Sequence, residues 1–198
     1  TKEEIKQIYV GNISEMLPIT DFNTENGRKI MRAQSIDVNP KEKEIKTNAM
    51  RILDRMKIPY THYTYECDEF IDGMQIVEKL NLKPEQVYKT LVTQGHSKAY
   101  FVFVIPVAEE LDLKKAAKAV GEKSLEMIHV KDINQITGYI RGGCSPLGAK
   151  KEYPVYLDES ARQWETIAVS AGKRGEQILL APMDLVQAVR AVTAALTK

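Results

Sequence analysis

Residues 87–105, VYKTLVTQGHSKAYFVFVI, decide the fold of this chain. Two runs rich in β-branched and aromatic residues, Val87–Thr93 and Tyr100–Ile105, flank the turn residues Gly95–Ser97. This arrangement predicts a β-hairpin whose second strand is entirely apolar. Because the turn is tight, at least this pair of strands is antiparallel.

Helical and strand patterns are interleaved irregularly on both sides of this hairpin, which favours the α+β class with a mixed sheet over a doubly wound fold. The predicted helices are one that starts at Thr47 or Asn48 and stops before Pro59, residues 71–80, residues 111–120, a short helix after Asp132, and a final amphipathic helix from Pro182 through Leu196. The predicted strands are residues 60–65, 87–93, 100–105, 125–130, 154–157, 166–170 and 177–180.

The composition is that of a globular protein with no cofactor or metal site. The 198 residues are 43% hydrophobic and 28% charged, and 28 basic against 27 acidic residues give a net charge of +1. That balance excludes a polybasic nucleic-acid binder. Two cysteines without a C-x-x-C spacing exclude a disulfide scaffold and give no support to structural zinc. The sequence also lacks GxGxxG and GxxxxGK[ST], the glycine-rich motifs that cradle nucleotide phosphates.

The chain has two parts by sequence character. Residues 1–46 mix polar stretches with short apolar islands and read as an extension, an interaction arm or an added leader, whereas residues 47–198 carry the clear periodicity of a domain. No apolar run approaches the ~20 residues that span a bilayer, and the first residues, TKEEIKQIYVGN, are charged where a signal peptide is apolar. We therefore expect a cytoplasmic protein without a membrane segment.

Lys89 is the most unusual charged residue, because it lies inside the strand VYKTLV, of which both faces are mostly apolar. A lysine in that position needs an anionic partner or a pKa lowered by desolvation, and either would suit a functional group. The alternative is a lysine on an edge strand that reaches water along its own stem.

Two loops are candidates for binding an anion. The first, GGCSPLG at 142–148, starts with a glycine pair that allows close approach of a ligand to the backbone N–H groups; otherwise it is a plain tight turn. The second, Gly172–Gly175, is a basic turn or a solvated hairpin tip. Together the loops offer up to five positive charges to a phosphate backbone, from Arg141, Lys150, Lys151, Lys173 and Arg174.

The remaining reactive side chains have weaker patterns. Cys144 could act as a nucleophile with His62 or His129 as its base, but a free cysteine is more often a small hydrophobic residue. Tyr63 and Tyr65 share one face of a predicted strand, where they could stack on a base or ribose or simply fill the core.

Five motifs in this order point to a family: KTNAMRILDRMKIPY, VYKTLV, LDLKKAAKAVG, TGYIRGGCSPLG and ETIAVSAGKRG. They strongly resemble the YbaK/EbsC aminoacyl-tRNA deacylases, which are similar to the editing insertion domain of bacterial prolyl-tRNA synthetase. The resemblance covers residues 47–198 and implies a compact α+β domain with a mixed, curved β-sheet flanked by helices.

The resemblance also implies the site. Lys89 matches the family's key lysine at the phosphate or carbonyl end of the substrate, and Gly142 and Gly143 match the glycine loop that shapes the pocket. The other implied substrate contacts are Tyr65, Phe70, Thr90, Ser145, Pro146 and Ser170. This chain departs from the family with Ala171 in place of glycine, Gln177 in place of an aspartate, and Cys144 in place of an aliphatic residue.

The activity implied is trans-editing, the hydrolysis of a wrong amino acid from tRNA, most characteristically Cys-tRNA(Pro). The substrate's own thiol would attack its ester carbonyl while the pocket holds the geometry, so no Ser-His-Asp constellation is needed. The implied partners are the acceptor end of proline tRNA and prolyl-tRNA synthetase, because the near-neutral chain would bind tRNA weakly alone. The alternative is a non-catalytic module of the same fold that binds tRNA or the synthetase or acts in regulation.

Overall fold

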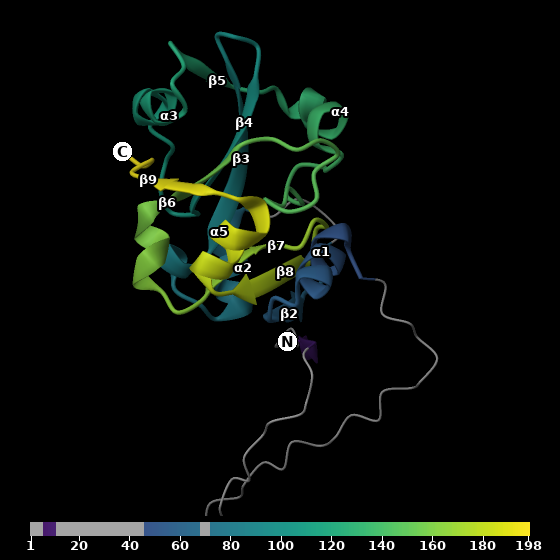
Figure 1. Cartoon of the computed structure of the whole chain (residues 1–198). Coiled ribbons are helices and arrows are strands. Elements are labelled where there is room, and N and C mark those ends of the chain that lie inside the picture. The colour runs from purple at the N-terminus through teal and green to yellow at the C-terminus, as the bar shows by residue number, and fades with distance from the viewer. Residues whose placement is uncertain (1–5, 11–45, 68–71) are drawn as a thin grey trace, which may run out of the picture. The chain divides into compact units, whose positions relative to one another are not determined.

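The computed structural model describes residues 6–10, 46–67 and 72–198 (Figure 1). All of them belong to one of the two units into which the chain divides. The strands are β1 Lys6–Val10, β2 Tyr60–Thr64, β3 Tyr88–Gly95, β4 Tyr100–Pro106, β5 Leu125–Met127, β6 Val155–Asp158, β7 Ile167–Ser170, β8 Glu176–Leu180 and β9 Val192–Ala194. The α-helices are α1 Asn48–Met56, α2 Gly73–Leu80, α3 Leu113–Val120, α4 Ile133–Thr137 and α5 Pro182–Val189, and short 3₁₀ helices span Pro84–Gln86, Val130–Asp132 and Glu159–Gln163.

The predicted hairpin is present, since β3 and β4 pair antiparallel from Tyr88–Pro106 to Gln94–Tyr100. Alternate residues of the apolar strand β4 serve two different cores. Phe101, Phe103 and Ile105 pack with α3, whereas Val102 and Val104 pack with the cluster that includes α1 and α5. An entirely apolar strand is required here because both of its faces are buried.

The described strands form two sheets, with the orders β1-β2-β8-β7 and β5-β3-β4-β6-β9. The first is antiparallel throughout, and the second combines antiparallel pairs with the parallel pairs β4–β6 and β6–β9. The α+β class and the mixed sheet predicted from the sequence are thus confirmed. The division into two sheets adds a feature that the local patterns do not contain.

The edge of β3 opposite β4 is only partly paired, and this creates the space for a site. At one end β5 pairs with Thr93–Gly95 and the Ile128 N–H donates to the Val92 carbonyl at 3.2 Å. At the other end a single bridge joins Val87 to Ala168 of β7. Between these points, among the described residues, the edge of β3 lines a cavity instead of pairing with another strand.

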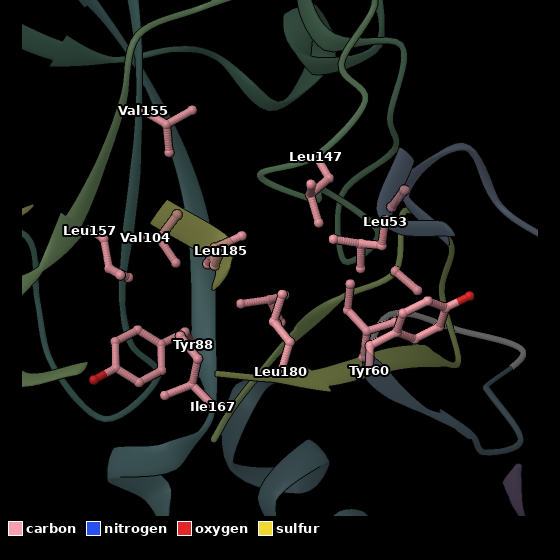
Figure 2. Packing of buried hydrophobic residues seen from close by; sticks show 14 of the residues in the cluster. Leu53, Tyr60, Tyr88, Val104, Leu147, Val155, Leu157, Ile167, Leu180 and Leu185 are labelled. Atoms are coloured by element: carbon pink, nitrogen blue, oxygen red, sulfur yellow. The ribbon is translucent and has the colours of Figure 1, made fainter. Parts of the chain in front are cut away.

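The main core joins elements from the whole described domain (Figure 2). Leu53 of α1, Leu180 of β8 and Leu185 of α5 are fully buried in it. Leu147 is also only 1% exposed, so the loop after α4 is anchored in the core by its own leucine. The rest of that loop is thereby held at a fixed position beside β3.

The predicted C-terminal helix is too long, because α5 ends at Val189. Arg190 adopts a left-handed conformation with φ of 53° and stops the helix. Val192–Ala194 then form β9, which pairs parallel with β6, and the Leu196 N–H donates to the buried Asp158 carboxylate at 2.9 Å. Leu196 is buried as predicted, but a strand delivers it to the core rather than a helix.

The segment before Thr47 is described only in part. Lys6–Val10 form β1, which pairs antiparallel with β2, although the sequence assigns these residues to the extension. The division at residue 46 stays a prediction. No helix in the described part of the chain is long and apolar enough to cross a membrane.

Candidate active site

A cavity of about 380 Å³ lies along the open edge of β3. Its wall is formed by α2, by β3 and the residue before it, by the residue after β4, by the segment from the end of β5 to the start of α4, by the loop after α4, and by the facing ends of β7 and β8. The residues that line it are Gly73, Ile76, Val87, Tyr88, Lys89, Thr90, Leu91, Val92, Val107, Met127, Ile128, Val130, Ile133, Arg141, Gly142, Cys144, Ser170 and Gln177.

Lys89 reaches this cavity from the interior of β3. Its side chain is half-buried, and Nζ donates to the Val107 carbonyl at 3.0 Å. Burial lowers the pKa of the ammonium below its ordinary value, while the nearby carboxylates of Glu110 and Glu109 act in the opposite direction. The lysine therefore presents a partly desolvated positive charge to the cavity, as the sequence pattern predicts.

Three more predicted residues lie around the same cavity, although they are far apart in sequence. Thr90 is next to Lys89 on β3, Gly142 comes from the loop after α4, and Ser170 ends β7. The Thr90 hydroxyl oxygen is buried and makes no hydrogen bond within the described residues. It is therefore available as a donor or acceptor to a bound molecule, since a buried hydroxyl without a partner is costly.

The two basic loops meet, which the sequence alone leaves open. Arg174 Nε donates to the Arg141 carbonyl at 2.8 Å. A Cβ added to Gly143 would lie 3.2 Å from the Arg174 amide nitrogen, a tight contact that would push the two loops apart by a few tenths of an ångström, so glycine favours their close approach. Gly143 itself does not line the cavity; it fixes the neighbouring Gly142 against the basic turn.

The other residues predicted for the glycine loop lie outside the cavity wall. Ser145 is buried and its hydroxyl accepts from the Leu147 N–H at 3.2 Å, so it holds the loop's own shape, and Pro146 is buried beside it. Lys150 and Lys151 are exposed beyond the loop. Lys173 is exposed and forms an ion pair with Glu176 at 2.8 Å.

Tyr65 does not line the cavity itself but contacts a residue that does. Gln177 lines the cavity and donates through Nε2 to the Tyr65 hydroxyl at 3.3 Å. Burial is the main reason that the pKa of Tyr65 is raised. Gln177 is 3% exposed and occupies the position where the family resemblance leads one to expect aspartate, so the cavity receives a neutral amide there. Phe70 lies outside the described residues.

Sequence reasoning missed the apolar wall formed by Met127, Ile128, Val130 and Ile133, and the contribution of α2 through Gly73 and Ile76. These residues look like ordinary members of a strand and two helices. The strand predicted at 125–130 is too long, because β5 ends at Met127 and Val130–Asp132 form a 3₁₀ turn, and the sequence pattern does not indicate this break.

Among the described residues, the lining includes two cations, Lys89 and Arg141, and no aspartate, glutamate or histidine. Within the described ranges, no three His, Cys, Asp or Glu side chains come close enough together to hold a metal ion. The cavity therefore suits a ligand that carries or develops negative charge, with stabilisation from the two cations and the polar groups of the loops.

Cys144 lines the cavity, but its surroundings oppose a role as nucleophile. Burial raises the pKa of the thiol to about 11, and Sγ points at the Ile140 carbonyl 3.6 Å away. We expect Cys144→Ala to retain catalysis within about tenfold, because the thiolate is scarce at neutral pH, whereas loss of a covalent nucleophile costs up to about 10⁶-fold. Single-turnover rates of the two proteins decide this, and a loss above ~10⁴-fold would restore the nucleophile hypothesis.

Comparison with known proteins agrees with this site. The model of the family described as "Aminoacyl-tRNA editing domain" matches residues 74–188, which contain all but the first of the lining residues. The chain is 50% identical over 143 residues, 72% of its length, to the "Putative Cys-tRNA(Pro)/Cys-tRNA(Cys) deacylase EbsC" of Enterococcus faecalis, of which 87% is covered.

Two further relatives are more distant. A proline–tRNA ligase of Shouchella clausii is 28% identical over 101 residues, which are 51% of this chain and 18% of the ligase. The structure titled "Crystal structure of a putative trans-editing enzyme for prolyl tRNA synthetase" superimposes with a TM-score of 0.66 at 20% identity, covering 78% of this chain and 99% of that one. At that identity the superposition establishes a common fold.

Proposed function

Because this chain belongs to the aminoacyl-tRNA editing domain family, we propose that it hydrolyses the ester bond of mischarged aminoacyl-tRNA in trans. The substrate is Cys-tRNA(Pro). The observation that carries the proposal is the meeting of Lys89, Thr90, Gly142 and Ser170 around one cavity, from three separate stretches of the chain.

The chemistry needs positioning more than acid–base groups, because an aminoacyl ester is already activated. The thiol of the substrate cysteine attacks the carbonyl carbon of its own ester, forming a thiolactone while the C–O bond to the ribose breaks. The ribose oxygen leaves with the thiol proton, and water then opens the thiolactone to free cysteine. Negative charge develops on the carbonyl oxygen in the first step.

The cavity supplies what this reaction requires. The Lys89 ammonium holds the phosphate of the terminal adenosine, and the backbone N–H of Gly142 donates a hydrogen bond to the carbonyl oxygen. Gly143 acts by positioning Gly142, because its own N–H donates to the Ile140 carbonyl at 2.9 Å. Thr90 and Ser170 bear hydroxyl groups that contact the aminoacyl part. Tyr65 supports this end of the cavity through Gln177, and Phe70, Ser145 and Pro146 stay proposed substrate contacts from the family resemblance.

The macromolecular partners follow from the substrate. The acceptor end of proline tRNA reaches the cavity, and the basic residues Arg141, Lys150, Lys151, Lys173 and Arg174 face its phosphates. Prolyl-tRNA synthetase presents the tRNA, because a chain of net charge +1 binds a polyanion weakly by itself. Such a protein works where translation takes place, in the cytoplasm.

A panel of aminoacyl groups on the same tRNA tests the substrate assignment. We expect the intact chain to release cysteine from Cys-tRNA(Pro) at least about tenfold faster than alanine from Ala-tRNA(Pro), because only cysteine carries the attacking thiol. Pro-tRNA(Pro) should be spared. Initial rates of deacylation, with and without prolyl-tRNA synthetase, provide the comparison. Equal rates for cysteine and alanine would argue against thiol assistance, and faster alanine release would make alanine the editing target.

The second candidate is the non-catalytic module that binds tRNA or the synthetase. Gln177 favours this non-catalytic function, because it places a neutral amide where the family resemblance leads one to expect a carboxylate. A chain that binds aminoacyl-tRNA without accelerating deacylation of any member of the panel would support this function in place of hydrolysis.

A further inference from the structure

The apolar wall of the cavity extends to its mouth. Of the large hydrophobic residues exposed in the described domain, Met127 at 45% and Val130 at 56% also line the cavity. A side chain that both lines a cavity and meets solvent lies at its opening. The opening is thus bordered by two apolar side chains that belong to none of the three core clusters of the described domain.

This apolar mouth is held in place by the fold. The Ile128 N–H donates to the Val92 carbonyl at 3.2 Å, and Ile128 packs against the main core. Val130–Asp132 form a 3₁₀ turn closed by the Asp132 N–H on the His129 carbonyl at 2.9 Å. Ile128 and Ile133 continue the same wall toward the interior. A rigid apolar surface of this kind suits a flat ring that comes to rest on it.

The proposed substrate supplies such a ring, and this inference rests on the proposed function. When the ester lies beside Lys89 and Gly142, the ribose and base of the same terminal nucleotide come next on the way out of the cavity. A nucleobase has apolar ring faces, and burying them against apolar side chains removes apolar surface from water, which is favourable. The methionine thioether is also a favourable neighbour for an aromatic ring.

We propose that Met127 and Val130 form the subsite for the terminal adenine of aminoacyl-tRNA. The cavity then contacts its substrate in two zones: the cationic and polar zone around Lys89 takes the aminoacyl ester and phosphate, and the apolar mouth takes the base. The base contributes affinity that does not depend on which amino acid is attached.

Two stable analogues separate these zones. The first is 3′-cysteinylamino-3′-deoxyadenosine 5′-phosphate, whose amide bond resists hydrolysis, and the second is the same molecule without adenine. Calorimetry gives the ratio of their dissociation constants for the intact chain, for Met127→Ser/Val130→Ser, and for Met183→Ser. Met183 is a matched control because it is a methionine exposed at 57% on α5 and does not line the cavity.

We expect the analogue with adenine to bind about tenfold tighter in the intact chain and in Met183→Ser, because the base removes apolar surface from water at the mouth. In the double variant the ratio should fall to about two or less, with an unchanged melting temperature. A ratio near one in the intact chain overturns the inference while leaving hydrolysis intact. The inference is also overturned if the double variant keeps the same ratio of dissociation constants as the intact chain. If that variant keeps the ratio but loses binding to prolyl-tRNA synthetase, the two side chains contact the synthetase and not the base. If the intact chain binds neither analogue, the inference and the proposed function both fail.

Discussion

Replacing Lys89 with methionine is expected to lower kcat/KM for Cys-tRNA(Pro) by about 10²–10³-fold, the range seen when one preorganised partner of a developing or bound charge is removed. Methionine keeps the unbranched stem that passes through the β3 edge and removes only the ammonium that donates to the Val107 carbonyl. The measurement is the deacylation rate across substrate concentrations. Lys118→Ala, an exposed lysine on α3, is the control and should match the intact chain.

The stability of the same variant separates a functional lysine from a structural one. Because burial lowers the pKa of Lys89 in the folded state, the folded protein binds fewer protons than the unfolded chain at pH values just below 10.5. The intact chain therefore gains stability as pH rises through that interval, and Lys89→Met lacks this gain. At neutral pH we expect the variant to melt at the same temperature or higher. A large loss of stability that parallels the loss of activity would mean that Lys89 serves the fold.

Replacing Gly143 with valine is expected to reduce deacylation about 10²-fold, because the loops that meet at this point must separate. Even an alanine Cβ would lie 3.2 Å from the Arg174 amide nitrogen and 3.3 Å from the Lys173 carbonyl carbon, both backbone atoms that cannot rotate away. A displacement of about 1 Å in a catalytic loop can cost a factor of that size, and the overpacking costs about 1–3 kcal/mol of stability. The measurement compares the deacylation rates and the unfolding free energies of Gly143→Ala and Gly143→Val with those of the intact chain.

Gly121→Ala is the matched control for this series. Gly121 ends α3 with φ of +75°, and an added Cβ meets nothing within 4 Å. Alanine at this position lowers the free energy of unfolding by about 1–2 kcal/mol through backbone strain alone. The residue does not line the cavity. We expect it to lose stability and keep its rate. If Gly143→Val keeps its rate as well, the contact between the two loops does not shape the site.

The sequence predicts the parts of the fold that depend on local chemistry. Thr47 caps α1 through its side chain, β3 and β4 form the predicted antiparallel hairpin, and the basic turn at 171–175 joins the antiparallel strands β7 and β8. Long-range pairing is less visible. Val192–Ala194 fit an amphipathic helix by spacing, and only the parallel contact with β6 makes them a strand.

The candidate site is predicted where a residue type is unusual and missed where it is ordinary. A lysine inside an apolar strand and a glycine pair beside an arginine attract attention, and Lys89, Arg141 and the first glycine, Gly142, line the cavity. Met127 and Val130 carry no such signal, because their importance depends on which edge of β3 is left unpaired, and Gln177 stands out only by comparison with the family pattern. The glycine pair is predicted to allow close approach of a ligand, but the close neighbour of Gly143 is the basic turn, and of the pair only Gly142 lines the cavity.

The most direct test of the central claim is multiple-turnover deacylation of Cys-tRNA(Pro), with the chain at one part per hundred of substrate on a molar basis and prolyl-tRNA synthetase present or absent. We predict release of many equivalents of cysteine per chain, well above the buffer control, and a return to nearly the control rate in Lys89→Met. Release indistinguishable from buffer under both conditions, or equal release by the intact chain and Lys89→Met, would contradict the assignment of this cavity as an editing site.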